Sequence, residues 1–432
     1  MRAIILSIGD ELVLGQTVDT NSAWLSQQLA AVGFAVAAHL TVADDQRAIE
    51  QAIEESVGRC DVLLISGGIG PTEDDLTRQA LAAVMKAPLE PNDVWLAELE
   101  NFFRARRRAM PEGNRIQAMI PRGATMIFNH AGTAAGIDAA YVSGDQKTVC
   151  RVFVMPGVPK EMKAMFTRDV LPHVKDLGGG AVILSRTLHT FGFGESAVAE
   201  RIGPQMMRGR NPSVGTTVSG GVVSVRINSS FASHEEAASE LASTEAACRA
   251  ALGDLVYGAD EDSLQDVVGR MLIEHAPGKT VVTAESCTGG LLAKMFTDKP
   301  GSSAYFDRGF VTYSNAAKED VLGVPAPVLS EHGAVSEPVV RAMVLGALRE
   351  SGAHFGLAIS GVAGPGGGTP QKPVGTVCIA VARAPTSAQD SAAEPLVRTF
   401  NFPGDREMIR DRAAKTALSM LRFHLLGKDL PF

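Results

Sequence analysis

Lys279-Thr-Val-Val-Thr-Ala-Glu-Ser-Cys-Thr-Gly-Gly290, followed directly by Leu291-Leu-Ala-Lys-Met-Phe-Thr297, is the stretch around which the C-terminal part of the chain is organised. Residues 280–283 are all β-branched and predict a short buried strand, whereas residues 291–296 favour a helix. The residues between them therefore form a strand-to-helix turn. At such a helix start, unpaired backbone N–H groups and the helix dipole stabilise developing negative charge. Ser286 is thus a candidate nucleophile, the alternative being a simple N-cap.

Composition limits the kind of protein. With 432 residues the chain exceeds what one core usually serves, so two or three domains are expected. No apolar run approaches the roughly 20 residues of a membrane helix. The apolar run near residue 1 is too short for a secretory signal. We therefore expect a soluble, cytoplasmic protein. Five widely spaced cysteines without a Cys-x-x-Cys pair predict neither disulfides nor a zinc cage, and a net charge of −8 argues against a general nucleic-acid binder.

The first 170 residues alternate apolar strands with amphipathic helices. Strands are predicted over residues 3–8, 34–40 and 61–65, and helices over residues 21–32 and 46–57. This order implies a mainly parallel sheet covered by helices on both faces. Functional sites in such sheets lie at the carboxyl ends of the strands.

A glycine loop, Ser66-Gly-Gly-Ile-Gly-Pro-Thr-Glu-Asp-Asp-Leu-Thr77, leaves the third strand. Its glycines let backbone amides approach an anion, and its carboxylates could hold a divalent cation that bridges phosphate oxygens. The alternatives are helix-N-terminal charges for the loop carboxylates and a turn for the aspartate after the second strand. The candidates are Gly67, Gly68, Gly70 and Thr72 for the anion, and Asp44, Asp74 and Asp75 for the metal.

Lys318 is the candidate general base for Ser286, because the nine histidines show no metal spacing and none is an obvious partner. It follows a strand predicted over residues 309–313, and a lysine with a lowered pKa can accept a serine proton. Tyr313 could orient the base or the substrate. A surface lysine and a core aromatic residue are the alternatives.

Other segments could bind anions. Strand 355–360 enters Gly361-Val-Ala-Gly-Pro-Gly-Gly-Gly368, which could hold a phosphate through backbone amides or be a flexible connection. Arg406 opens the last helix and could pair bidentately with a phosphate, with Arg410 on the same face. We interpret the arginine-rich residues 103–115 as a solvated helix face, with a nucleic-acid patch or an anion site as alternatives.

Gly178–Gly180 and Asp260–Asp262 mark domain boundaries. The predicted domains comprise residues 1–170, 171–255 and 256–432. The middle one contains strands 182–191 and 221–227 and helices 195–207 and 234–252, which is a small α+β connecting domain. The fold class is therefore α/β.

The N-terminal motifs resemble the CinA (competence- and damage-inducible) family: Gly9-Asp-Glu-Leu12, Gln16-Thr-Val-Asp-Thr-Asn-Ser-Ala-Trp24, Ser66-Gly-Gly-Ile-Gly-Pro-Thr-Glu-Asp-Asp75 and Met155-Pro-Gly-Val-Pro-Lys-Glu-Met162. The resemblance implies an α/β/α molybdopterin-binding fold and an ADP-ribose pyrophosphatase that needs a divalent metal (Mg, Mn or Co). Its products would be AMP and ribose 5-phosphate. Asn21 and Asn129 join the substrate-binding candidates. Ala135 departs from the family, which has proline there.

The C-terminal motifs resemble the same family: Ala284-Glu-Ser-Cys-Thr-Gly-Gly290, Gly309-Phe-Val-Thr-Tyr-Ser-Asn-Ala-Ala-Lys318, His332-Gly-Ala-Val-Ser-Glu-Pro338, Ser360-Gly-Val-Ala-Gly-Pro365 and Pro373-Val-Gly-Thr376. They imply an α/β/α nicotinamide-mononucleotide deamidase without a cofactor. Ser286 would be the nucleophile, Lys318 the base and Tyr313 a supporting residue. The substrate-binding residues would be Thr288, Gly289, Ser360, Gly361, Gly364 and Arg406. The resemblance also implies a KH-like middle domain and a homodimer, but without a Gly-x-x-Gly clamp we expect no RNA binding.

Two alternatives remain at this point. Cys287 could replace Ser286 as the nucleophile, because thiolates at helix starts are activated. The protein could also be a pterin- or nucleotide-binding partner in competence, with one or both sites inactive.

Overall fold

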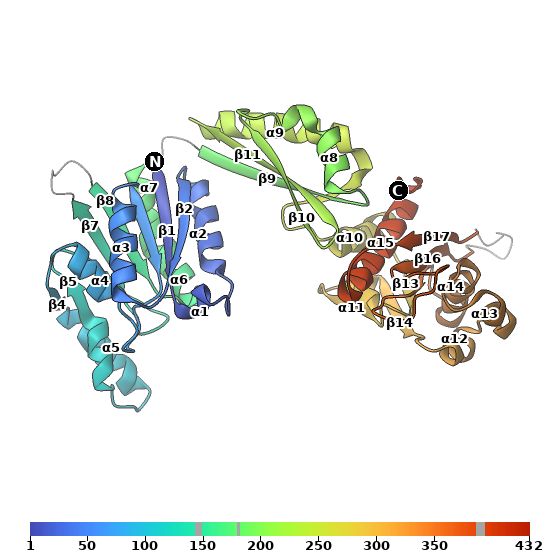
Figure 1. Cartoon of the computed structure of the whole chain (residues 1–432), viewed down its shortest axis with the longest axis horizontal. Coiled ribbons are helices and arrows are strands. Elements are labelled where there is room, and N and C mark those ends of the chain that lie inside the picture. Colours follow the sequence, from blue (N-terminus) through green and yellow to red (C-terminus); the bar gives the residue numbers. More distant parts are fainter. Residues whose placement is uncertain (143–148, 179–181, 386–393) are drawn as a thin grey trace. The chain divides into compact units, whose positions relative to one another are not determined.

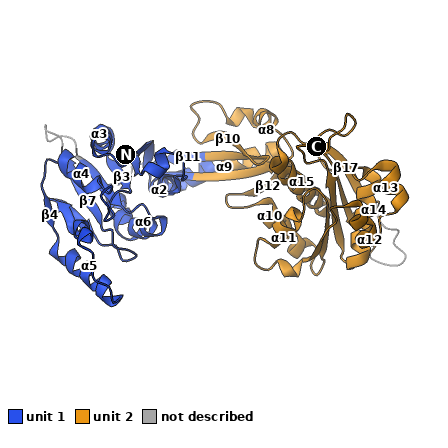
Figure 2. Cartoon of the chain, turned by 60° about the horizontal axis from the view of Figure 1, so that its bottom comes forward, with its two compact units in different colours: residues 1–184, 228–241 blue, residues 185–227, 242–432 orange. Residues whose placement is uncertain are grey.

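The computed structural model describes residues 1–142, 149–178, 182–385 and 394–432. Gly179 and Gly180, in the predicted boundary, lie outside the described residues. The chain divides into two compact units (Figure 2), Met1–Leu184 with Asn228–Leu241, and Ser185–Ile227 with Ala242–Phe432. Within the described ranges, no helix is both long enough and apolar enough to cross a membrane.

The first unit is built on a six-stranded sheet (Figure 1). Its strands, with a separate β4–β5 pair, are β1 (Arg2–Ile8), β2 (Ala35–Val42), β3 (Val62–Ser66), β4 (Leu89–Pro91), β5 (Met119–Pro121), β6 (Thr125–Ile127), β7 (Gly136–Val142) and β8 (Val149–Met155). The order is β2-β1-β3-β8-β7-β6. The first four of these strands run parallel, whereas β7 is antiparallel to β8 and to β6.

Helices cover both faces of this sheet, as predicted. They are α1 (Asp10–Val13), α2 (Thr20–Ala31), α3 (Gln46–Val57), α4 (Thr77–Val84), α5 (Asp93–Ala105), α6 (Pro159–Met165) and α7 (Leu171–Leu177), with a 3₁₀ helix at Glu112–Ala118 and a π turn at Phe166–Val170. Side chains alternate along β1, so that Leu6 packs in the core with α3 and α4, while Ile5 packs in the core with α2 and α6. Because both faces of the sheet are covered, the loops at the strand ends are the part of the sheet open to a ligand.

The arginine-rich residues 103–115 are only partly helical, contrary to prediction. Helix α5 ends at Ala105, and Arg107 has a φ of 56°, a left-handed conformation that an α-helix does not continue. The rest of the segment is mostly exposed.

The middle segment forms a four-stranded sheet of order β10-β11-β9-β12 with two helices. Its elements are β9 (Val182–Phe191), α8 (Glu195–Arg201), β10 (Ser213–Ser219), β11 (Val222–Phe231), α9 (His234–Leu252) and β12 (Val256–Ala259), with 3₁₀ turns at Gly203–Gln205 and Gly253–Leu255. The helix predicted over residues 195–207 ends at Arg201, because Gly203 and Pro204 do not continue an α-helix. The predicted α+β class of this segment is confirmed.

The C-terminal part carries a five-stranded sheet of order β14-β13-β15-β16-β17. Its strands are β13 (Val281–Glu285), β14 (Phe306–Val311), β15 (Phe355–Gly361), β16 (Thr376–Arg383) and β17 (Leu396–Asn401). Its helices are α10 (Leu264–His275), α11 (Leu291–Thr297), α12 (Asn315–Leu322), α13 (Ala326–His332), α14 (Glu337–Ser351) and α15 (Arg406–Leu426), with a 3₁₀ turn at Ser302–Ala304. β13 pairs in parallel with β14 and β15, and the remaining pairs are antiparallel.

Both faces of this second sheet are also covered. Val281 and Leu357 pack in the core with α10, α11 and α15, whereas Val282 and Ala358 pack in the core with α12, α13 and α14. The strand predicted over residues 309–313 is shifted and ends at Val311, so Tyr313 lies beyond it. The parallel strands β13, β14 and β15 therefore end at one edge, which carries the candidate residues.

Candidate active sites

Ser286 and Lys318 meet at the carboxyl edge of the C-terminal sheet. Ser286 follows β13, and Lys318 lies in the first turn of α12. Lys318 Nζ is hydrogen bonded to Ser286 Oγ at 3.1 Å, and both side chains are buried. A nucleophile in hydrogen-bond contact with a basic group is the geometry that nucleophilic catalysis needs.

The surroundings of Lys318 favour a neutral amine. Its side chain is 1% exposed, and burial lowers the pKa of its ammonium group. Nζ also donates to the carbonyl oxygens of Thr312, at 2.9 Å, and Tyr313, at 3.5 Å. A neutral amine can give its two N–H groups to these carbonyls and keep its lone pair for the Ser286 hydroxyl.

Glu285 occupies the helix start that we expected to bind an oxyanion. Its fully buried carboxylate accepts the backbone N–H groups of Gly290 (3.0 Å), Leu292 (3.0 Å) and Ala293 (2.8 Å). This corrects the prediction that the first amides of α11 serve the reaction, because a carboxylate already satisfies them. The sequence gives one indication of this role, because Glu285 is a charged residue at the end of an otherwise uncharged strand.

Two amides of the turn have no hydrogen-bond partner elsewhere in the described part of the chain. Ser286 N donates to Ile359 O, Gly289 N to Ser286 O, and Leu291 N to Thr288 O. The N–H groups of Cys287 and Thr288 donate to no other described residue, and both residues are buried. Both directly follow the nucleophile in the chain, where an oxyanion hole is expected.

Cys287 lacks the properties of a nucleophile. Its thiol is 6% exposed, and burial raises its pKa to about 12. A Cβ on Gly361 would lie 3.1 Å from Cys287 Sγ, so the sulfur packs against the end of β15. All five cysteines are buried and free. A thiol in this state forms little thiolate at neutral pH.

Arg406 connects Tyr313 with the glycine loop after β15. Its guanidinium donates to Gly364 O at 2.8 Å and to the Tyr313 hydroxyl at 3.1 Å. Tyr313 is 62% exposed, so it is not a core aromatic residue. Arg410, one turn further along α15, donates to Thr288 O at 2.6 Å. The start of α15 thus holds both the serine turn and the glycine loop.

Two predicted substrate-binding hydroxyls are turned inward. Ser360 is 1% exposed and donates to Ala334 O at 2.7 Å. The Thr288 hydroxyl is buried without a hydrogen-bond partner among the described residues. Neither hydroxyl is freely presented to a ligand.

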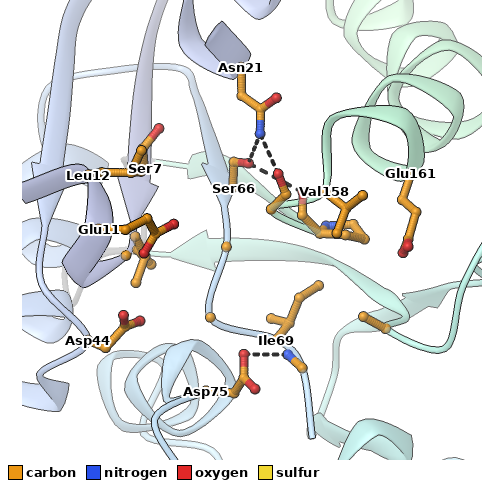
Figure 3. Close-up of a pocket in the computed structure, with 18 of the residues that line it drawn as sticks. Ser7, Glu11, Leu12, Asn21, Asp44, Ser66, Ile69, Asp75, Val158 and Glu161 are labelled. Atoms are coloured by element: carbon orange, nitrogen blue, oxygen red, sulfur yellow. Dashed lines mark hydrogen bonds between the residues drawn. The ribbon is translucent and has the colours of Figure 1, made fainter. Parts of the chain in front are cut away.

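In the first unit, the predicted glycine loop lines a cavity of about 590 Å³ at the carboxyl edge of the sheet (Figure 3). Gly67 has a φ of 110°, and a Cβ there would lie 2.3 Å from Ile8 O, so only glycine fits. Asp75 accepts hydrogen bonds from Gly70 N (2.6 Å), Thr72 N (2.8 Å) and the Thr72 hydroxyl. Asp75 therefore braces the loop from within.

The two predicted asparagines are mostly engaged by the protein. Asn21 lines the cavity, and its Nδ2 donates to Ser66 Oγ and Gly157 O, whereas its Oδ1 is buried without a partner among the described residues. Asn129 donates to Ala134 O and Glu161 Oε2, and its Oδ1 accepts the amides of Ala131 and Gly132. Asn129 shapes the neighbouring loop but does not line the cavity.

Carboxylates gather on one side of this cavity. Figure 3 places Glu11 beside Asp44, with Glu161 on the opposite side. Burial raises the pKa of Asp44, as do the neighbouring negative charges of Asp10, Asp74 and Glu11. No described lysine or arginine forms an ion pair with Glu11, Asp44 or Asp74. Glu11 and Glu161 are residues that our sequence reasoning missed.

This donor set suits a hard divalent cation. Carboxylate oxygens are the ligands that Mg²⁺ and Mn²⁺ prefer, and Mg²⁺ typically takes one or two of them together with substrate phosphates. The described residues contain no group of three or more His, Cys, Asp or Glu side chains placed to hold a metal ion, so the predicted ligands Asp44, Asp74 and Asp75 do not form a three-carboxylate site. Asp44 and Asp74 are the better candidates, because Asp75 already accepts loop hydrogen bonds through both oxygens.

A buried arginine lies behind the glycine loop. Arg78 is fully buried and donates to the carbonyl oxygens of Ile69 and, at 3.4 Å, Gly70. Burial lowers the pKa of Arg78 to about 10, so it stays protonated at neutral pH. Its charge favours an anion at the loop, a role that the sequence did not indicate.

Comparisons with known proteins cover the whole chain. Residues 4–176 match the family model described as "Probable molybdopterin binding domain", residues 185–258 the "Damage-inducible protein CinA KH domain", and residues 261–425 the "CinA C-terminal domain". The chain is 44% identical to a "Putative competence-damage inducible protein" of Symbiobacterium thermophilum, over 99% of both chains. It is also 44% identical to a "CinA-like protein" of an Anaeromyxobacter species, over 98% of both.

A solved structure is also similar in sequence. The competence damage-inducible protein A of Klebsiella pneumoniae is 38% identical over 38% of this chain and 95% of its own, with a TM-score of 0.35.

Proposed function

The chain belongs to the CinA family, and we propose that it is a pyridine-nucleotide salvage hydrolase with two sites. The C-terminal site deamidates nicotinamide mononucleotide to nicotinic acid mononucleotide and ammonia. The N-terminal site hydrolyses ADP-ribose to AMP and ribose 5-phosphate. The observation that carries the first activity is the buried contact between Lys318 Nζ and Ser286 Oγ.

In the first half of the deamidation, Ser286 attacks the carboxamide carbon while Lys318 takes its proton. The carbonyl oxygen becomes an oxyanion that accepts hydrogen bonds from the backbone N–H groups of Cys287 and Thr288. Lys318 then gives its proton to the amide nitrogen. The C–N bond breaks, ammonia leaves, and an ester to Ser286 remains.

Water completes the reaction. Lys318, neutral again, removes a proton from a water molecule, and the resulting hydroxide attacks the ester carbon. The same two amides accept hydrogen bonds from the second oxyanion. Collapse breaks the ester bond, returns the proton to Ser286 and releases nicotinic acid mononucleotide. Lys318 accepts and returns every transferred proton, so the steps balance without a cofactor.

The phosphate of the nucleotide is placed at the start of α15. Arg406 already reaches Gly364 O and the Tyr313 hydroxyl, and its remaining N–H groups suit a phosphate oxygen. Arg410 holds the turn at Thr288, so it positions the oxyanion amides.

For the N-terminal site, the supporting observation is a glycine loop facing carboxylates that have no described basic partner. The amides of Gly68 and Ile69, which donate to no described group, bind the pyrophosphate, with Arg78 behind them. The amides of Gly70 and Thr72 are not available, because they donate to Asp75. Asp44 and Asp74 would hold the divalent metal, which when bound polarises a phosphate oxygen and activates water.

Product analysis by mass spectrometry tests both activities. The full chain is incubated separately with nicotinamide mononucleotide and ADP-ribose, with and without EDTA. Deamidation should survive the chelator, whereas pyrophosphate cleavage should stop and return with added Mg²⁺ or Mn²⁺. Binding of both nucleotides by calorimetry without any turnover would instead favour the alternative, a nucleotide-binding protein associated with competence. Calorimetry with molybdopterin addresses the pterin form of that alternative.

A further inference from the structure

The C-terminal part contains a second cavity that neither proposed activity uses. It has a volume of about 410 Å³ and lies beside Lys279 and His354, just before β13 and β15 begin. Ser286 and Ser360 lie where the same strands end. At about 3.3 Å per residue the two ends are roughly 20 Å apart, so this cavity is distinct from the serine site.

Every ionisable side chain that lines this cavity is basic. The lining residues of this kind, which we call the basic pocket, are Lys279, Arg383, His275, His354 and His424. No described carboxylate lines it, and neither Lys279 nor Arg383 forms an ion pair with a described residue. In a chain of net charge −8, two permanent cations together in one cavity favour an anionic ligand.

Two of the three histidines have contacts that fix their rings. Thr280 N donates to His354 Nδ1 at 3.2 Å, which leaves the proton of the neutral ring on Nε2. His424 packs edge-on against Phe355, with ring centroids 6.0 Å apart. Burial and then the charge of Lys279 lower the pKa of His354; burial and then Arg383 lower the pKa of His424. His354 and His424 thus each lie within the field of one of the cations.

We propose that the basic pocket binds the phosphate group of a small molecule. A phosphate carries close to two negative charges at neutral pH, which the charges of Lys279 and Arg383 match. Arginine binds phosphate through a planar fork and lysine as a point charge, and the imidazole N–H groups supply further donors. Apolar walls are available for an organic part of the ligand and consist of Ala276, Pro277, Phe355 and Leu425.

Histidine resonances offer a local test in the full chain. The protein is labelled with ¹⁵N-histidine, which gives nine histidines to follow, and His354 and His424 are assigned with His354→Gln and His424→Gln. Inorganic phosphate is then titrated at constant ionic strength, with chloride as the exchanged anion. We expect saturable shifts of both resonances. In the double variant Lys279→Gln/Arg383→Gln the apparent Kd should rise at least about tenfold, because charged hydrogen bonds are lost.

A matched double variant controls for charge. Arg308→Gln/Arg398→Gln removes the same net charge from exposed positions on β14 and β17 and should leave the shifts unchanged. The proposal is overturned if phosphate gives no saturable shift, or if the shifts persist at the same concentration without Lys279 and Arg383. A parallel titration with AMP separates the two sources of phosphate: tighter binding than inorganic phosphate identifies a nucleotide, and equal or weaker binding identifies free phosphate.

Discussion

Lys318 Nζ lies 3.1 Å from Ser286 Oγ, although Ser286 follows strand β13 and Lys318 lies in helix α12, which comes after the neighbouring strand β14. The register of β13 with β14 brings the turn after Glu285 next to the segment that leads into α12. This contact gives the Ser286 hydroxyl a base inside the protein.

Ser286→Ala should abolish deamidation, because no other described side chain of the site can form the ester. We expect kcat to fall at least about a thousandfold, as for other nucleophilic serines. Cys287→Ala is the matched neighbour and should change kcat less than about tenfold, because its thiol packs rather than reacts. Ammonia release measures both. Full activity in Ser286→Ala would refute the serine mechanism.

The deamidation rate should rise with pH. Protonated Lys318 has no lone pair, so only the neutral amine accepts the Ser286 proton. Burial lowers the pKa of Lys318, so kcat/KM should rise with pH to a plateau. The midpoint of this rise, which is the apparent pKa, should lie below the ordinary 10.5. Lys318→Met should lose activity at every pH. A pH profile that is flat from pH 6 to 10 would contradict this role.

Glu285→Gln should lower kcat with little effect on KM. A neutral amide cannot replace a carboxylate that accepts three backbone N–H groups, so the turn carrying the Cys287 and Thr288 amides loosens. We expect a decrease of about tenfold to a hundredfold, measured by steady-state kinetics on protein whose folding is verified by circular dichroism. An unchanged kcat in folded protein would show that Glu285 is only a helix cap.

Tyr313→Phe should affect binding more than chemistry. The Tyr313 hydroxyl contacts Arg406 and not Lys318, so its removal frees the guanidinium from one partner. We expect KM for nicotinamide mononucleotide to change by a few fold and kcat to stay nearly constant. A large loss of kcat alone would instead make the hydroxyl part of the proton transfer.

Asp74→Asn and Asp75→Asn should impair ADP-ribose cleavage in different ways. Asp74 is exposed at the cavity, so its loss should raise the Mg²⁺ concentration needed for ADP-ribose cleavage by about tenfold or more. Asp75 braces the loop, so Asp75→Asn should raise KM for ADP-ribose at saturating metal. Asp93→Asn, on α5, is the control. Identical metal dependence in wild type and Asp74→Asn would mean that the cation is misplaced.

The α/β class could be predicted from local pattern, because buried parallel strands and the helices that cover them each leave a periodic signature. Residues 3–8 are apolar except for Ser7, and residues 280–283 are all β-branched. The helix over residues 46–57 was predicted with its observed bounds. Predictions failed where backbone conformation overrides composition, as at Arg107 and at Gly203–Pro204.

The sequence by itself determined which chemical groups stand at strand ends: a serine at a helix start, a lysine beyond the next strand, and a glycine loop with aspartates. Only the tertiary structure decided what each group contacts. It joined Ser286 with Lys318, turned the Ser360 hydroxyl toward Ala334 and used Asp75 to brace its own loop. It also assigned the amides of α11 to Glu285. Residue type and spacing decide which hydrogen bonds are available, whereas strand register and helix packing decide which are satisfied within the protein and which are left for a ligand.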